Sequence, residues 1–241
     1  MSLLWMAVIT FAILQASVFA TTIYLHRSIT HKGVELHPAV RFLMHLELML
    51  FTGIIPREWA AVHRKHHHHS DEVGDPHSPR VLGMWTVLFG NYFLYKKEAN
   101  NQATINKYTP DYHPDPLDRV PMFIQNYSIF LGLGIFMLMF GWAWGLVAWS
   151  IHIVAYVLLN SSINSLCHMI GYRNFDNLAT NIQLIALFTG GEGLHNNHHE
   201  FPTSARFALR GREIDLAWPV IQLLEKCGLA TINRLPIAKA A

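Results

Sequence analysis

The chain has 241 residues, of which 51% are hydrophobic and only 14% are charged. Soluble domains carry about 25% charged residues, so this composition indicates a membrane protein, and the net charge of +2 gives no sign of a nucleic-acid partner. The length suits one domain, residues 1–241, without room for a separate reductase or electron carrier. The two cysteines, Cys167 and Cys227, form no CxxC pair, which excludes a thiolate-built metal site.

The first predicted element is a membrane span over residues 3–25. The first 25 residues contain no charge, and a helix of this length, at about 1.5 Å per residue, crosses the hydrocarbon core. A cleaved signal peptide is the alternative, with Phe19-Ala20 resembling a cleavage site, but the basic segment that such a peptide needs is missing. Arg27 and Lys32 follow, which predicts that this end lies in the cytoplasm and the N-terminus outside.

Two further apolar segments are predicted to lie in the membrane surface. Residues 40–55 are short for a span, contain His45 and Glu47 and have an arginine near each end, so we expect an interfacial or re-entrant helix. Residues 81–95 are rich in tryptophan, phenylalanine and tyrosine and are expected to form another interfacial helix.

A helical hairpin is predicted from residues 124–141 and 145–161. No charged residue occurs between Pro121 and Leu159, and the GWAWG segment in the middle supplies a bend with interfacial tryptophans. Together these elements predict an all-α membrane protein with three transmembrane helices, interfacial helices and a cytoplasmic helical cap.

Histidine is the unusual residue of this chain, with 16 copies against 18 lysines and arginines. Most of them gather in four short groups on the predicted cytoplasmic side of the membrane. The groups are HRSITH with His26 and His31, HRKHH with His63, His66 and His67, NSLCH with His168, and GEGLHNNHH with His195, His198 and His199.

The spacing of these histidines points to metal binding. Residues at i, i+3 and i+4 share one helix face, so each HxxHH motif is expected to project its three imidazoles together. Imidazole is a ligand for iron, zinc or copper. Nine such groups exceed what one metal can bind, which predicts a site with two metals.

The remaining histidines receive other interpretations. Four are taken as surface or hydrogen-bonded residues: His37, His45, His77 and His113. His68 and His69 are expected to fall off the ligand face. For His152, inside a predicted span, packing with a hydrogen bond and a role in the site both stay open; Cys167 is interpreted as a small packed residue.

These motifs together resemble the membrane fatty-acid desaturases, specifically the delta-9 acyl-CoA and acyl-lipid branch. The resemblance extends over residues 20–236 and rests on HRSITH, HRKHH and GEGLHNNHH in that order, with NSLCH between the second and third. It implies a di-iron centre held by nine histidines, with Asn164 holding one iron through a water. The implied ligands are His26, His31, His63, His66, His67, His168, His195, His198 and His199.

The resemblance also implies a reaction and its partners. Dioxygen would remove two hydrogens from neighbouring methylenes of a fatty acyl chain and leave a cis double bond. Electrons would come from a small haem or iron–sulfur carrier with its reductase. A metal–oxygen species is needed because no side-chain acid or base can break an aliphatic C–H bond. The expected location is the inner (plasma) membrane of a bacterium, with the active site facing the cytoplasm.

Four acidic residues near the motifs are expected to hydrogen-bond the second nitrogens of the imidazoles and so fix their orientation. They are Asp71, Glu72, Asp75 and Glu192.

Two departures from the family and several rival functions remain. Family members usually have a complete hairpin before the first motif, where this chain has one predicted span. Acyl-CoA members commonly carry Arg-Asp where this chain has Ala61-Val62, which leaves an acyl-lipid or another acyl carrier open. A related di-iron hydroxylase or decarboxylase is an alternative. A membrane metal transporter or a haem protein is a more distant one, because such proteins place their ligands at mid-membrane depth.

Overall fold

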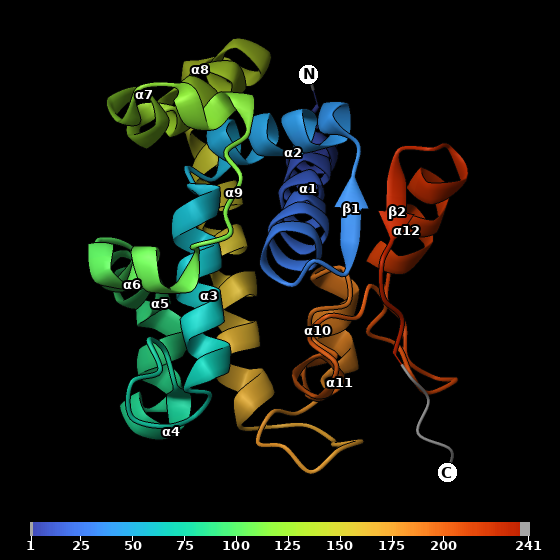
Figure 1. Ribbon diagram of the computed structural model, residues 1–241. Coiled ribbons are helices and arrows are strands. Elements are labelled where there is room, and N and C mark those ends of the chain that lie inside the picture. Colours follow the sequence, from blue (N-terminus) through green and yellow to red (C-terminus); the bar gives the residue numbers. More distant parts are fainter. Residues whose placement is uncertain (1, 237–241) are drawn as a thin grey trace.

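The computed structural model describes residues 2–236 and consists mainly of helices packed side by side (Figure 1). The long helices are α1 (Leu3–Ala20), α2 (Pro38–Phe51), α3 (Pro56–His68), α5 (Met84–Ala99), α8 (Ile129–Phe140), α9 (Trp142–Ser165) and α12 (Ala217–Lys226). The short ones are α4 (Pro79–Leu82), α6 (Gln102–Tyr108), α7 (Met122–Tyr127), α10 (Gln183–Phe188) and α11 (His195–Glu200). Three segments are non-α helices: the π-helix η1 (Thr21–Thr30) and the 3-10 turns η2 (Pro116–Arg119) and η3 (Leu166–His168).

Within residues 2–236, two helices are long and apolar enough to cross a membrane. One is the continuous helix Leu3–Thr30, formed by α1 and η1, and the other is Trp142–His168, formed by α9 and η3. Both leave large apolar side chains exposed, such as Phe11 on α1 and Ile151 on α9, as expected of helices that face lipid. The spans predicted at residues 3–25 and 145–161 fall within these two helices.

The span predicted at residues 124–141 is not one long helix. It is divided into α7 and the 12-residue α8, and α8 alone is short for a crossing, which needs about 20 residues. The Ser128 hydroxyl at the break donates hydrogen bonds to the carbonyl oxygens of Met49 and Gln125. Gly132 packs against the Leu50 carbonyl too closely for a side chain to fit. The chain bends here because α8 rests on the end of α2.

The segment predicted at residues 40–55 as interfacial or re-entrant is likewise bent. Helices α2 and α3 meet at an angle of 90°, the geometry of a broken span or a re-entrant loop. Gly53, with a φ of 66°, and Pro56 at the start of α3 make the turn.

The segment predicted at residues 81–95 forms most of α5. Trp85, Phe89 and Phe93 are exposed along it, which is typical of a helix at a membrane interface.

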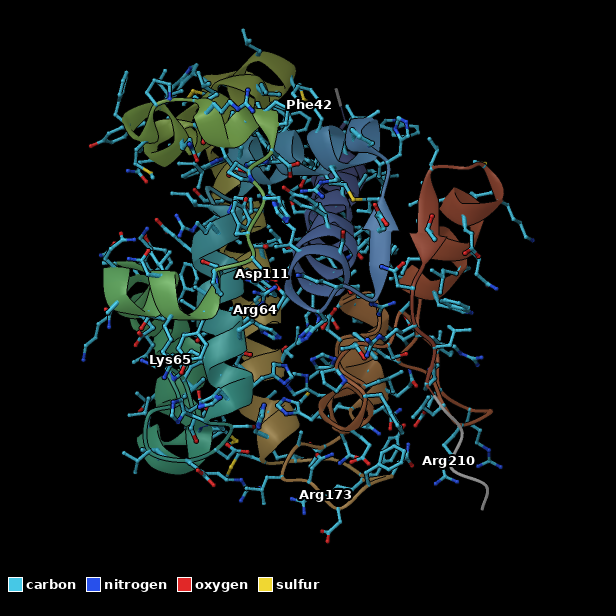
Figure 2. All side chains as sticks on the ribbon, in the orientation of Figure 1. Phe42, Arg64, Lys65, Asp111, Arg173 and Arg210 are labelled. Atoms are coloured by element: carbon cyan, nitrogen blue, oxygen red, sulfur yellow. The ribbon has the colours of Figure 1, made fainter. Side chains whose placement is uncertain are left out.

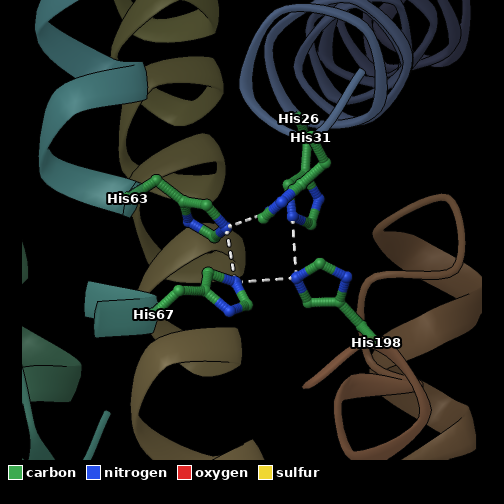
Figure 3. Close-up of side chains that lie close together, drawn as sticks. All are labelled: His26, His31, His63, His67 and His198. Atoms are coloured by element: carbon green, nitrogen blue, oxygen red, sulfur yellow. Dashed lines mark hydrogen bonds between the residues drawn. The ribbon is translucent and has the colours of Figure 1, made fainter. Parts of the chain in front are cut away.

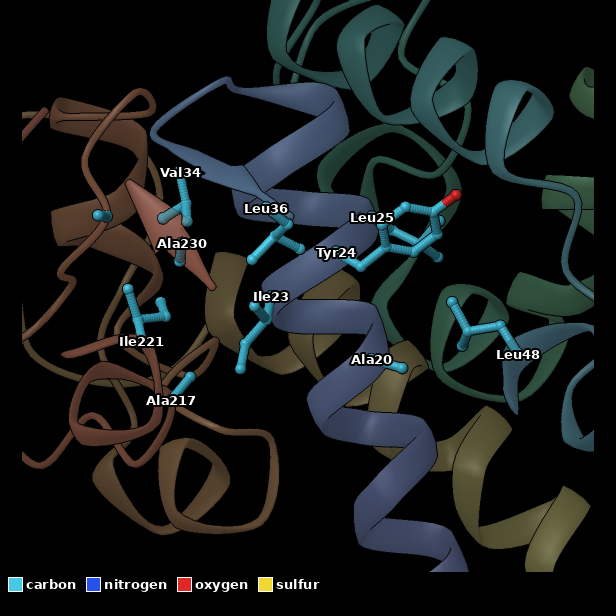
Figure 4. Close-up of a cluster of buried hydrophobic side chains, with 11 residues drawn as sticks. Ala20, Ile23, Tyr24, Leu25, Val34, Leu36, Leu48, Ala217, Ile221 and Ala230 are labelled. Carbon is cyan, nitrogen blue, oxygen red and sulfur yellow. The ribbon is translucent and has the colours of Figure 1, made fainter. Parts of the chain in front are cut away.

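A small antiparallel sheet departs from the all-α prediction. Strand β1 (Val34–Leu36) pairs with β2 (Ala230–Ile232), which joins the segment after η1 to the end of the described chain. Val34 and Leu36 point to the same side because strand residues alternate. There they pack on Ile23, Leu25 and Ile221 in a buried apolar cluster (Figure 4).

Polar contacts connect the other helices to this core. Figure 2 shows Arg64 of α3 beside Asp111, and the two side chains form an ion pair at 2.5 Å. Arg64 also donates to the carbonyl oxygens of Ile29 and Thr30 in η1.

Arg173 and Arg210 lie at the opposite end of the molecule from Phe42 of α2 (Figure 2).

The buried Arg27 side chain joins η1 to the C-terminal third of the chain. Its guanidinium pairs with Asp215 at 2.9 Å, donates to the carbonyl oxygens of Ala205 and Gly190, and lies 3.9 Å from the centre of the Phe207 ring. Gly191, with a φ of 103°, passes so close to this ion pair that a side chain would clash with it. The buried charge is tolerated because the two terminal nitrogens of Arg27 are hydrogen-bonded and paired with Asp215, although Nε has no hydrogen-bond partner in the described part of the chain.

We expect Arg27→Met to destabilise the protein strongly, because it leaves Asp215 buried without its partner, a loss of about 3–5 kcal/mol. Thermal unfolding of the metal-free protein in detergent measures the effect. Lys32→Ala removes an exposed pair with Asp111 and should cost about 0–1 kcal/mol. Equal loss of stability in the two variants would contradict the structural role given to Arg27.

Candidate metal centre

Nine histidines converge in two neighbouring clusters inside the helical bundle. The first cluster consists of His26, His31, His63, His67 and His198. The second consists of His66, His168, His195 and His199. In each cluster one ring nitrogen from every member lies within 4.8 Å of all the others. Figure 3 shows the first cluster, with imidazoles from η1, α3 and α11 pointing at one another.

The π-helix brings His26 and His31 to the same side. Its hydrogen bonds run from residue i+5 to residue i, and His31 N–H donates to the His26 carbonyl oxygen at 3.1 Å. In an α-helix, residues five apart point in different directions. The two histidines of HxxxxH therefore face the same cluster only because the helix is π-helical at this point. Such π-helical segments often occur at functional sites.

Each HxxHH motif serves both clusters, which corrects the expectation that its three imidazoles act together. His63 and His67, one helical turn apart, belong to the first cluster, whereas His66 belongs to the second. The motif on α11 is divided in the opposite sense: His195 and His199 belong to the second cluster and His198 to the first. Helices α3 and α11 thus lie on either side of both clusters and connect them.

The spacing between the ring nitrogens fits a metal. In the first cluster, Nε2 of His198 lies 3.0 Å from Nε2 of His26 and 2.9 Å from Nε2 of His67. In the second, His195 Nε2 lies 3.0 Å from His168 and 3.1 Å from His199. A metal about 2.1 Å from each imidazole nitrogen places neighbouring octahedral ligands about 3.0 Å apart. Both clusters are therefore compatible with bound metal ions.

Carboxylates set the direction in which three imidazoles present their lone pairs. Nδ1 of His26 contacts Glu192 at 2.6 Å, Nδ1 of His66 contacts Asp75 at 2.9 Å, and Nδ1 of His168 contacts Asp71 at 2.8 Å. When Nδ1–H donates to a carboxylate, Nε2 carries the lone pair and faces into the cluster. The expectation for Asp71, Asp75 and Glu192 is met, whereas Glu72 is exposed and does not fit it.

Burial favours the neutral form of most of the clustered imidazoles, and hydrogen bonding favours the ionised form of Asp71 and Asp75. Burial, reinforced by neighbouring histidines, lowers the pKa of His195, His198 and His199 well below the usual value. Burial alone would raise the pKa of Asp75, but its hydrogen bonds with the His66 side chain and the His77 backbone lower it far below its usual range. Neutral imidazoles beside ionised carboxylates are the protonation states that a metal requires of these groups.

Two asparagines within GEGLHNNHH position α11 and were missed by the sequence analysis. The Asn196 amide donates to the carbonyl oxygens of Phe175 and Ala179, and its oxygen accepts from the N–H groups of Asn174 and Phe175. Asn197 donates to Phe207 and Glu213. Both asparagines are buried, so they hold the histidine-bearing turn through bonds to distant loops. The sequence signal that could have indicated this role is the pair of consecutive asparagines between two histidines of the motif.

The histidines outside the clusters only partly follow the sequence interpretation. His37 caps α2 by accepting from Ala39 N–H, and His113 is exposed. His68 and His69 stay outside both clusters. His45 and His77, however, are buried rather than at the surface, and neither ring nitrogen of His77 has a hydrogen-bond partner among residues 2–236.

Two residues inside the helical bundle pack as structural groups. His152 Nε2 lies 2.9 Å from the Phe51 carbonyl oxygen, which favours packing with a hydrogen bond. Cys167 is buried and contacts the Gly193 carbonyl, as expected of a small packed residue.

A cavity of about 1020 Å³ runs along the clusters and is lined by His26, His63 and His195. Asn164 of α9 also lines this cavity, together with apolar side chains such as Val62, Ile153 and Val157. A long apolar chain placed in this cavity would pass directly beside the converging imidazoles.

Comparison with known proteins agrees with this geometry. A sequence model of the fatty acid desaturase family matches residues 3–212. The chain belongs to the fatty acid desaturase family. It is therefore an enzyme of oxidoreductase type, and the family implies a fatty acyl substrate.

Three proteins of similar sequence illustrate the range of activities named for relatives of this desaturase. It is 36% identical to the sn-1 stearoyl-lipid 9-desaturase of Anabaena variabilis, over 89% of this chain and 78% of that protein. It is 33% identical to the acyl-CoA C20 Delta5-desaturase of Anemone leveillei, over 96% of this chain and 74% of that protein. It is 29% identical to the Delta-9 acyl-lipid desaturase 2 of Arabidopsis thaliana, over 98% of this chain and 76% of that protein.

We expect Glu192→Gln to lower metal affinity at the first cluster by about 10–100-fold, because the His26 imidazole loses its anionic partner. The metal retained per chain during titration with a chelator measures this effect. Glu72→Gln, the same change at an exposed position, is the control. If both variants hold metal as tightly as the wild type, the carboxylate does not tune this site.

Proposed function

We propose that this desaturase uses two iron ions and dioxygen to introduce a cis double bond into a fatty acyl chain carried by a lipid or by CoA. The observation that carries the proposal is the pair of histidine clusters, five and four imidazoles, along one cavity with apolar walls. The proposed ligands are the nine clustered histidines, with Asn164 holding one iron through a water. Bound iron would activate dioxygen for aliphatic C–H cleavage, which no side-chain acid or base can perform.

The residues of this chain provide binding, orientation and exclusion of water. The buried carboxylates of Asp71, Asp75 and Glu192 hold imidazoles in the tautomer that leaves Nε2 free. Trp59 stacks on the His63 ring, with ring centres 4.8 Å apart, and lines the same cavity. Such contacts fix the ligands before metal arrives, which is the main requirement of a precise site.

The cavity suits a substrate with an apolar chain and a polar end. It is lined by the charged and polar side chains of Glu58, Lys96 and Asn100 as well as by apolar ones such as Ile153 and Val157. We infer that the acyl chain lies along the apolar part and the head group remains near Lys96. The named relatives act on acyl lipids and on acyl-CoA, so both carriers belong in the proposal.

We further propose that the clusters face the cytoplasm at the inner membrane of a bacterium. After α9 the chain carries Arg173, Arg206, Arg210 and Arg212, and positive charge favours the cytoplasmic side. This end of the molecule, where Figure 2 shows Arg173 and Arg210, would receive a small haem or iron–sulfur electron carrier. The helical segments at this end of the molecule would form the cytoplasmic cap. Helix α8 would pair with α9 to complete the predicted hairpin.

A related hydroxylation or decarboxylation on the same scaffold is the alternative outcome. The same metals and cavity would serve it, because the product depends on how the chain lies relative to the metals. A haem protein or transporter is not supported, since the chain belongs to the desaturase family and His152 in α9 bonds to a backbone carbonyl instead.

We expect a bacterial host that expresses the wild-type protein to accumulate a new unsaturated fatty acid. A host expressing His198→Ala at equal membrane abundance should lack it, because that change removes a ligand of the first cluster. Mass spectrometry of derivatised fatty acids locates the double bond, and separate analysis of lipid and CoA fractions identifies the carrier. A hydroxylated or shortened product would favour the alternative chemistry, and the same new acid in both hosts would contradict the proposed site.

A further inference from the structure

His77 is a buried imidazole that the fold leaves without a partner. It follows α3 in the turn Gly74–Ser78 and is 4% exposed. Its backbone N–H donates to Asp75 Oδ1 at 3.0 Å, which fixes the turn. Neither Nδ1 nor Nε2 of its ring has a hydrogen-bond partner in the described part of the chain.

This arrangement costs stability unless something else binds the ring. A buried polar group without a hydrogen bond costs about 1–3 kcal/mol, and native proteins keep few such groups. Asp75 lies nearby, but its Oδ2 already accepts from His66 and from the Asp71 N–H. The Asp75 carboxylate thus pairs with the His66 ring, and the His77 ring has no hydrogen-bond partner among the described residues.

The position of His77 relates it to the second cluster. Its ring centre lies 4.8 Å from that of His66, a member of the cluster. It lines the same cavity as His195, another member, and as Asn164. His77 is not itself within the mutual distance that defines the cluster, so it lies beside the four imidazoles rather than among them.

We propose that His77 binds a small polar molecule, of the class of water or azide, in the cavity beside the second cluster. Four histidines leave more open positions on an octahedral metal than the five of the first cluster do. His77 hydrogen-bonds the molecule that takes such a position and orients it from the side of the cavity. This inference rests on the proposed metal loading, and His77 acts as a positioning residue.

The test compares His77→Phe, which keeps an aromatic ring without nitrogens, with His77→Gln, which restores a hydrogen-bonding group. His113→Phe is the control, the same change at an exposed position. Three quantities are measured on purified protein: iron per chain, azide affinity from the absorption change of the iron-loaded protein, and the unfolding temperature without metal.

We expect His77→Phe to keep both irons and to bind azide about tenfold more weakly, the effect of losing one hydrogen bond. His77→Gln should recover most of the affinity, and the metal-free His77→Phe protein should unfold no earlier than the wild type.

Two results would overturn the proposal. One is unchanged azide affinity in His77→Phe; the other is loss of iron or of metal-free stability, which would make His77 a support for His66. A wild-type protein that binds no iron would instead refute the proposed function itself, so the two failures are distinguishable.

Discussion

The convergence of neutral imidazole nitrogens is the constraint on which the rest of this structure depends. Lone pairs about 3 Å apart repel one another unless a cation lies between them, and here nine of them meet in two groups. The carboxylates of Glu192, Asp75 and Asp71 oppose any change of tautomer that would relieve the repulsion. The site is therefore organised for cations at the expense of the empty protein's stability, a trade that functional sites commonly show.

Irregular backbone makes this convergence possible. The π-helical stretch turns His26 and His31 to one side, and after the 90° bend the histidines of α3 face η1. The buried ion pair of Arg27 and Asp215 then fixes the C-terminal segment against η1, and the amides of Asn196 and Asn197 hold α11 to neighbouring loops. Each of these features is costly alone, and together they help to position the four histidine-bearing segments around the same two points.

Much of the candidate site could be predicted from the sequence, because it depends on local spacing. The four histidine groups and three of the four acidic partners lie where the motifs suggested. The division of each HxxHH between two clusters was not predictable, since periodicity gives the face of a helix but not what lies on either side of it. The break at Ser128 and the pairing of Val34 with Ile232 depend on contacts between distant segments. His77 was misjudged because its burial comes from the tertiary fold.

The most direct test of this view is diffraction from the iron-loaded protein at wavelengths on both sides of the iron absorption edge. We predict two anomalous peaks, one enclosed by His26, His31, His63, His67 and His198, and the other by His66, His168, His195 and His199. A single peak, peaks outside the clusters, or a signal that persists below the iron edge would contradict a centre built for two irons.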